Sequence, residues 1–201
     1  NSSITVNSSN GYLLSTKNDF SQYVANQFYL SERLKFLIEQ KNELSLEDIQ
    51  NIQDDIYSPI TKLILPYVMN ILEKNPDIEY FKQIFTYFKN WDCTMDKSSI
   101  SATIYNTFIY YLCKNTLEDE LGSDLLLEFT KNPTTSIENT LLNITKKFNI
   151  WFDNINTKQK VETMEDIYII SLKNAIQHLK NNLGAEPKNW IWAELHKIYF
   201  I

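Results

Sequence analysis

Histidine and cysteine, the side chains best suited to carry protons or act as thiol nucleophiles, are rare in this sequence. Their spacing gives no sign that they lie close together. His178 and His196 are the only histidines, and Cys93 and Cys113 are the only cysteines. A Cys–His nucleophile pair needs one imidazole beside one thiol, and nothing in the spacing places two of these side chains together. We therefore interpret the cysteines as small buried apolar residues and the histidines as surface imidazoles. The cysteines also lack the CxxC spacing of a zinc or redox motif.

Two acidic runs, Asp54-Asp55 and Glu118-Asp119-Glu120, could supply carboxylates for acid–base chemistry. Glycosidase chemistry, however, needs two carboxyl groups facing each other across a cleft, and these are neighbours along predicted helices. Solvated helix faces are therefore the better interpretation. The aromatic residues, 13% of the chain, recur at helical spacing, which is typical of a core.

The charge balance limits the classes of partner. The chain has 19 basic and 25 acidic residues, a net charge of −6, and Arg33 is its only arginine. Nucleic-acid binding favours clustered lysine and arginine, so we expect no nucleic-acid partner. The uncharged stretch 98–113 is too short and too rich in Ser and Thr to span a bilayer, and we expect no membrane partner. No cofactor motif is evident in the chain.

The composition predicts a mainly α, multi-helix domain with one or two short strands at its ends. Three Gly and five Pro in 201 residues are too few for an all-β domain with frequent tight turns. We divide the chain into a short strand and turn at residues 1–18, a helical domain at 19–184, and a final segment at 185–201. That final segment, around Trp190 and Trp192, is either a strand or a short helix.

Capping and breaking residues predict where the helices begin and end. The apolar stripe from Leu30 to Ile38 predicts a helix that ends before Lys41. Further helix starts are predicted at Ser45 with Asp48, Ser58-Pro59, Asn75-Pro76, Ser98 or Ser99, Thr135 with Glu138, and Thr163 with Asp166. Pro66 should kink or stop the helix in which it lies, Gly122 should interrupt another, and Gly184 should end the last.

The order of several short motifs resembles the late part of the large (β) chain of the penicillin acylase (penicillin amidase) family. The resemblance covers nearly the whole chain and rests on pieces that occur in the family's order. These are Gly11-Tyr12-Leu-Leu-Ser-Thr-Lys17-Asn18, Leu30-Ser-Glu-Arg33-Leu34, Leu44-Ser45-Leu-Glu47-Asp48 with Gln53-Asp54, Leu65-Pro66, Phe88-Lys-Asn-Trp91-Asp92, Ser101-Ala-Thr-Ile104-Tyr105, and Leu183-Gly184 with Trp190-Ile-Trp192-Ala-Glu-Leu195-His196.

The resemblance implies an N-terminal nucleophile hydrolase of αββα architecture, of which this chain is a helical, C-terminal portion. Such an enzyme is made as a precursor that cuts itself to expose a serine, whose own α-amine acts as its base. That serine is absent here, because the Ser9-Asn10 pair lies internally in front of the Gly-Tyr segment. We therefore expect a fragment that is inactive alone. Its expected partners are the remainder of its precursor and a small-molecule acyl amide substrate.

One catalytic element of the family falls inside the chain by resemblance. The family's oxyanion hole includes an Asn side-chain amide in the turn after the Gly-Tyr strand, and Asn18 is the candidate. A strict alignment from Gly11 places Lys17 at the first of two successive family Asn positions and Asn18 at the second. In the same alignment, Leu30 takes the place of an arginine that lies near the family's active site. Arg33 comes one turn later, at a position that is more often structural.

Calcium is possible in the parent enzyme. Asp19 aligns with a calcium-binding Asp of the family if the alignment gap is placed just before it, and otherwise reads as an Asx-turn residue. The alternative to the whole enzymatic interpretation is a free-standing helical interaction module without activity, in which exposed aromatic side chains bind a partner. The sequence does not indicate the acyl group, the compartment or the oligomeric state.

Overall fold

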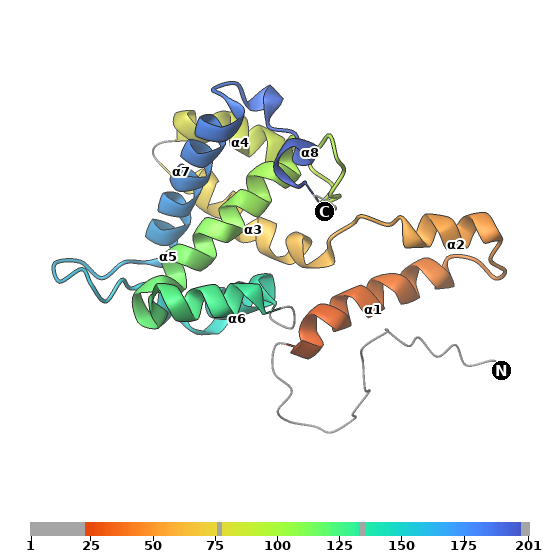
Figure 1. Cartoon of the computed structure of the whole chain (residues 1–201), viewed down its shortest axis with the longest axis horizontal. Helices are drawn as coiled ribbons and strands as arrows, with labels where there is room; N and C mark the ends of the chain where they lie inside the picture. Colours follow the sequence, from red (N-terminus) through yellow and green to blue (C-terminus); the bar gives the residue numbers. More distant parts are fainter. Residues whose placement is uncertain (1–22, 76–77, 133–135, 198–201) are drawn as a thin grey trace.

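The computed structural model describes residues 23–75, 78–132 and 136–197, and within these it leaves the side chains of residues 23–28 and 78–80 undescribed. The chain is mainly helical over these ranges, which confirms the predicted fold class (Figure 1). The predicted strand and turn at the start of the chain lie outside the described residues. The helices are α1 (Tyr23–Glu39), α2 (Leu46–Gln53), α3 (Pro59–Lys74), α4 (Ile78–Lys89), α5 (Ile100–Lys131), α6 (Ile137–Lys147), α7 (Met164–Leu183) and α8 (Trp192–Leu195), with short 3₁₀ helices η1 (Asn149–Phe152) and η2 (Pro187–Asn189).

The core forms around α5, which packs along α7 and is also contacted by α4 and α6. Phe108 and Leu112 of α5 and Leu172 of α7 are completely buried. The first half of α5 carries almost no charge, so most of its surface can be buried without desolvating an ionised group. The first half of α5 therefore lies at the centre of the bundle.

Several helix starts follow from local capping chemistry, as predicted. Ser45 and Asp48 form a reciprocal capping box at α2, and Thr163 and Asp166 form another at α7. Ser58 caps α3, with Pro59 in its first turn, and Ser99 caps α5. Each hydroxyl accepts a hydrogen bond from a backbone N–H that has no partner within the helix.

Two other predictions need correction in detail. Pro66 was predicted to kink or stop its helix, and the stop does not occur, because α3 continues to Lys74. Pro66 lies on the exposed face of α3, and the buried residues of the opposite face, including Val68 and Leu72, hold the helix together across it. The cap of α6 is Ser136, one residue after the predicted Thr135, which lies outside the described residues.

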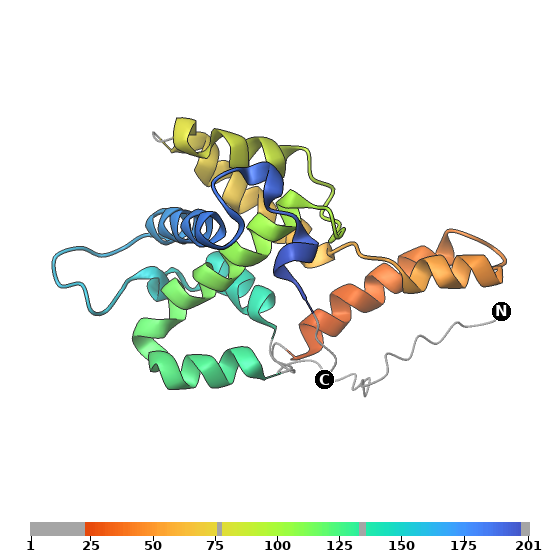
Figure 2. The ribbon, with the colours of Figure 1, turned by 45° about the horizontal axis from the view of Figure 1, so that its top comes forward.

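Gly122 interrupts α5, as predicted. Its φ of 73° and ψ of 165° belong to a backbone region used almost only by glycine, so the two parts of α5 run in different directions (Figure 2). Gly184 ends α7 with φ of 91°, which confirms the predicted helix end. The segment after it forms η2 and α8, so up to residue 197 the Trp190 region is short helix rather than strand. Trp190 is buried in the core, and Trp192 is half-buried.

The described residues contain almost no β structure: their one isolated bridge pairs Tyr57 with Thr94. Within the same ranges, we find no helix with the length and hydropathy that a bilayer crossing would require.

α1 and α2 lie side by side and extend away from the bundle formed by the other helices (Figures 1 and 2). We call residues 29–56 the α1–α2 arm. None of its described side chains is fully buried, and α1 contacts the bundle through α3. The arm contains Leu30, which the family resemblance aligns with an arginine near the active site, and Arg33, which it places at a more often structural position.

Candidate functional site

Arg33 is fixed by an ion pair at the base of the α1–α2 arm. Its Nε donates to Oδ2 of Asp55 at 2.8 Å, and its Nη2 donates to Oδ1 at 3.0 Å. The guanidinium carbon also lies 4.4 Å from the ring centre of Tyr57 and 5.5 Å from that of Phe36. A bidentate, stacked guanidinium is held in one orientation. The role of Arg33 in this structure is therefore to link α1 to the segment after α2.

The same ion pair corrects the interpretation of Asp55 as part of a solvated helix face. α2 ends at Gln53, so Asp55 lies beyond the helix, and its hydrogen bonds with Arg33 lower the pKa of its carboxyl group. The pKa of Arg33 is raised by the same hydrogen bonds. This geometry depends on residues 22 positions apart, and no local pattern reveals such a pairing.

The segment after Asp55 is anchored to the bundle by backbone hydrogen bonds. The N–H of Ser58 donates to the carbonyl of Cys93 at 3.0 Å, and the N–H of Met95 donates to the carbonyl of Ile56 at 2.9 Å. Cys93 adopts a φ of 67°, which is uncommon for a non-glycine residue, at the centre of this pairing. The anchor therefore connects the arm to the loop between α4 and α5.

Trp91 and Asp92, which carry part of the family resemblance, stabilise that loop. The indole Nε1 of Trp91 donates to the carbonyl of Thr94 at 2.9 Å. Asp92 Oδ1 accepts from the N–H of Thr94 at 2.9 Å and from its Oγ1 at 2.6 Å, and these bonds lower the pKa of Asp92. Trp91 and Asp92 therefore stabilise the loop between α4 and α5, to which the base of the arm is hydrogen-bonded.

A buried polar cluster lies where α3, α5 and α6 meet. Tyr105 donates from its hydroxyl to Oε1 of Glu138 at 2.8 Å, and Thr61 Oγ1 lies 3.5 Å from the same oxygen. Burial raises the pKa of Glu138 and raises that of Tyr105 well above its ordinary value. Glu138 was predicted to open this helix together with Thr135, which lies outside the described residues. Among the described residues, its carboxyl group accepts a hydrogen bond from a buried phenol. This was the main polar group that the sequence reasoning missed.

The cysteines and histidines do not come together within the described residues. Cys93 and Cys113 are both buried in the core, as predicted, and burial raises the pKa of the Cys113 thiol to about 12. His178 Nδ1 lies 3.2 Å from the hydroxyl of Tyr111, and the ring of His196 stacks on Trp192 with 4.7 Å between ring centres. A thiol this hard to ionise is a poor nucleophile, and the two imidazoles contact aromatic side chains rather than thiols.

A small polar pocket lies between α5, α7 and the loop that follows η1. Its volume is about 210 Å³. It is lined by Lys114, Asn115, Glu118, Asp119, Asn154, Asn156, Ile167 and Ile170. Asp119 closes one side, because its Oδ2 accepts a hydrogen bond from the N–H of Ile155 at 2.8 Å.

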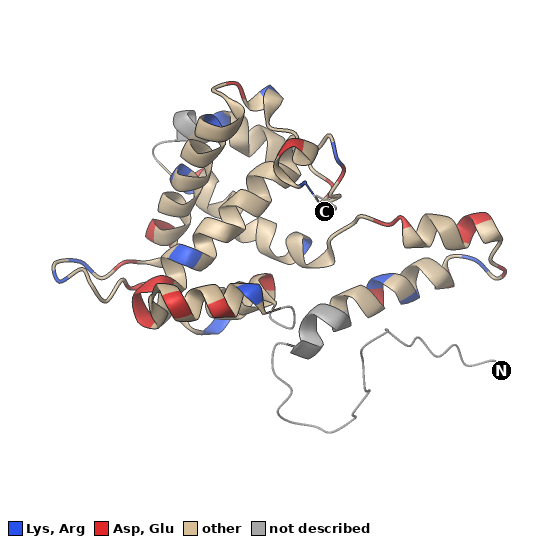
Figure 3. Cartoon of the chain, viewed as in Figure 1, with Lys and Arg blue, Asp and Glu red and all other residues tan. Residues whose placement is uncertain are grey.

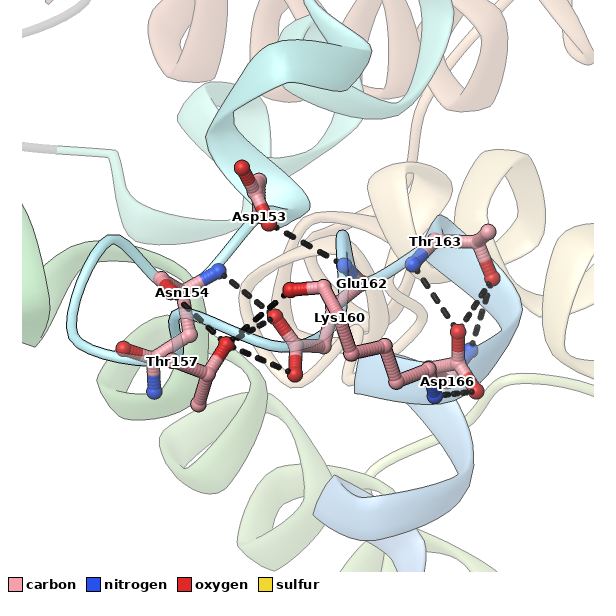
Figure 4. A network of polar contacts seen from close by, with 7 residues as sticks. All are labelled: Asp153, Asn154, Thr157, Lys160, Glu162, Thr163 and Asp166. Atoms are coloured by element: carbon pink, nitrogen blue, oxygen red, sulfur yellow. Dashed lines mark hydrogen bonds and ion pairs between the residues drawn. The ribbon is translucent and has the colours of Figure 1, made fainter.

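The loop beside this pocket is held by its own polar network (Figure 4). Glu162 accepts from the hydroxyl of Thr157 at 2.8 Å and from the N–H of Asn154 at 3.1 Å. Asp153 Oδ1 accepts from the N–H of Glu162 at 3.1 Å, and Lys160 donates to Asp166 at 2.7 Å. These bonds connect both ends of the loop to each other and to the start of α7, which gives it a defined shape.

Several acidic residues follow closely along α5 where the helix changes direction, next to the pocket (Figure 3). Burial raises the pKa of Glu120 to about 7. A hydrogen bond with Asp119 and the negative charge of that residue act in the same direction. Asp153 adds to the repulsion, and Oε2 of Glu120 is buried without a hydrogen-bond partner. Among the described residues, no group of three or more His, Cys, Asp or Glu side chains has an arrangement suited to a metal ion.

The residues that the resemblance singles out are only partly described. Lys17, Asn18 and Asp19 lie outside the described residues. Leu30 is largely exposed on α1, one turn before Arg33. The described residues place Leu30 and Arg33 on the α1–α2 arm, rather than inside the bundle.

The sequence matches a known protein family. The chain matches the family described as Penicillin amidase over residues 3–201. A comparison with curated proteins gives no match. The family match covers nearly the whole sequence, including all the segments that carry the resemblance. This chain belongs to the penicillin amidase family.

Proposed function

We propose that this chain is the supporting helical portion of an amidohydrolase that cleaves acyl amides through an N-terminal serine located elsewhere in the same precursor. The family match over residues 3–201 is the observation that carries this proposal. Two further findings agree with it. The two cysteines are buried, and the two histidines contact aromatic side chains, so these four residues do not form a thiol–imidazole pair among the described residues.

In the proposed reaction, the α-amine of the missing serine takes the proton of its own hydroxyl, and the serine oxygen attacks the amide carbonyl carbon. The carbonyl oxygen becomes negative, the amine product leaves with a proton, and water then hydrolyses the acyl-enzyme. Asn18 contributes one N–H donor to the negative oxygen. A neutral amide suits this role because it stabilises the charge in any protonation state of its surroundings.

The test uses the protein as its gene encodes it, with Asn18→Ala and a matched control, Asn10→Ala. Loss of one oxyanion donor should lower kcat about a hundredfold or more. Asn10 has the same side chain eight positions earlier, outside the proposed hole, so its replacement should leave kcat within a factor of about two. An unchanged rate for Asn18→Ala would end the assignment of Asn18.

A further inference from the structure

The α1–α2 arm carries apolar side chains that the rest of the described protein leaves uncovered. Leu46 is 74% exposed, and the other strongly exposed apolar residues of the arm are Leu30, Phe36, Leu44, Ile49 and Ile56. None of the eight residues of α2 is buried, whereas the longer α3 buries most of one face. Isolated helices this short are marginal in water and rely on packing of an apolar face. The exposed side of α2 therefore has the character of an interface.

The arm is nevertheless held in a fixed position. The bidentate ion pair between Arg33 and Asp55 joins its two helices, and Tyr57 stacks on the guanidinium at its base. The backbone bonds between residues 56–58 and 93–95 then attach that base to the bundle. A surface whose geometry is set in advance pays less ordering entropy when a partner binds.

The charges of the arm indicate which partner fits. Two cation–anion pairs, Arg33 with Asp55 and Lys41 with Asp48, are internal to the arm. The remaining charged side chains are Lys35 and the acidic residues Glu32, Glu39, Glu43, Glu47 and Asp54. The apolar residues are thus surrounded by excess negative charge. Two copies packed arm against arm would bring these acidic rims together, which disfavours a second copy as the partner.

We propose that the α1–α2 arm is the surface through which this helical chain docks onto the remainder of its own precursor, where an apolar surface rimmed with Lys or Arg covers Leu46 and Ile49. This inference rests on the proposed function. In the sequence, α1 begins at Tyr23, five residues after Asn18, which the proposed function places in the catalytic site. This short connection in the chain keeps the arm at a high effective concentration near the part of the precursor that surrounds the catalytic site.

Thiol accessibility tests the proposal in the full protein as its gene encodes it. Leu46→Cys and Ile49→Cys are the probes, and Ile150→Cys, at a 79% exposed apolar position on η1, is the matched control. Cys93 and Cys113 are buried and should react slowly. In the native protein, the two arm cysteines should react with a maleimide at least about tenfold more slowly than after unfolding in urea. The control cysteine should react at close to its unfolded rate.

Two results would overturn the proposal. One is reaction of both arm cysteines at their unfolded rates in the native protein. The other is protection that disappears on dilution, because it would identify a second copy as the partner. Amide hydrolysis measured on the same samples separates this inference from the proposed function. Protected arm cysteines without hydrolysis would refute the function alone, and reactive arm cysteines with hydrolysis would refute the docking alone.

Discussion

Arg33 and Asp55 form two parallel hydrogen bonds, 2.8 and 3.0 Å long, that join α1 to the segment following α2. Both side chains are only about one-fifth to one-quarter exposed, at 21% and 24%. The pair is therefore better shielded from water than an ordinary surface ion pair, and its planar geometry favours one relative position of the two helices.

Replacing Arg33 by Ala should loosen the α1–α2 arm. We expect the free energy of local opening of α2 to fall by about 1 kcal/mol, because a bidentate and partly shielded pair lies at the upper end of surface ion-pair energies. Hydrogen exchange of the α2 amides measures this opening. Lys35→Ala, which removes an exposed cation from the same helix, is the control and should change α2 exchange far less. Equal effects of the two substitutions would refute the role given to Arg33.

Tyr105→Phe should destabilise the bundle by leaving the buried carboxyl group of Glu138 without its 2.8 Å donor. The expected cost is about 1 to 3 kcal/mol, the usual range for an unsatisfied buried polar group. Urea unfolding measures it. Tyr110→Phe removes an exposed hydroxyl from the same helix and should be nearly neutral. If the two variants unfold at the same urea concentration, the hydrogen bond to Glu138 does not contribute as we infer.

Glu120 should make the protein less stable as the pH rises from about 5 to 8. Its pKa is raised from 4.5 to about 7 in the folded protein, so folding favours the protonated carboxyl group. This contribution is fully present below pH 4.5 and is lost as the pH rises through 7. Allowing for partial exposure, we expect about 1 to 2 kcal/mol.

The measurement for Glu120 is urea unfolding at several pH values between 5 and 8. Glu120→Gln should flatten the pH dependence and raise stability at pH 8, because the amide cannot ionise beside Asp119. Glu128→Gln, an exposed substitution on the same helix, should leave the slope unchanged. An identical slope in the wild type and in Glu120→Gln would contradict the raised pKa.

Gly122→Ala should cost about 1 to 3 kcal/mol, the range for a residue held in a sparsely populated backbone region. The cause is the backbone alone, because a Cβ at this position would meet nothing within 4 Å. Thermal unfolding measures the loss, and Ser123→Ala at the exposed neighbouring position is the control. A stability equal to that of Ser123→Ala would show that the two parts of α5 can reach their directions without glycine.

The sequence could predict those features that depend on a few adjacent residues. The capping boxes at Ser45 and Thr163 and the glycine at the end of α7 were confirmed, because each is a local hydrogen bond or backbone preference. Pro66 does not stop α3, as it could have done, because the cost of the lost helix bond is local, whereas the packing that offsets it comes from distant residues.

The polar contacts of the candidate site could not be predicted for a related reason. In the sequence, Asp55 looks like an exposed helical acid and Glu138 like a residue that opens a helix, yet their partners are 22 and 33 residues away. Only the tertiary fold brings Arg33 and Tyr105 to them. The family resemblance, by contrast, rests on the order of motifs and was confirmed over residues 3–201 without any knowledge of these contacts.

The central claim is that the reactive serine lies outside these 201 residues and that this chain supports it. The most direct measurement treats the full protein with an activated acyl amide, traps the acyl-enzyme, and locates the added mass in peptide fragments. We expect a burst of one amine released per protein molecule and an acyl group on an N-terminal serine peptide that is absent from this sequence. An acyl group on any residue of this sequence, or hydrolysis without any acyl-enzyme, would contradict the account.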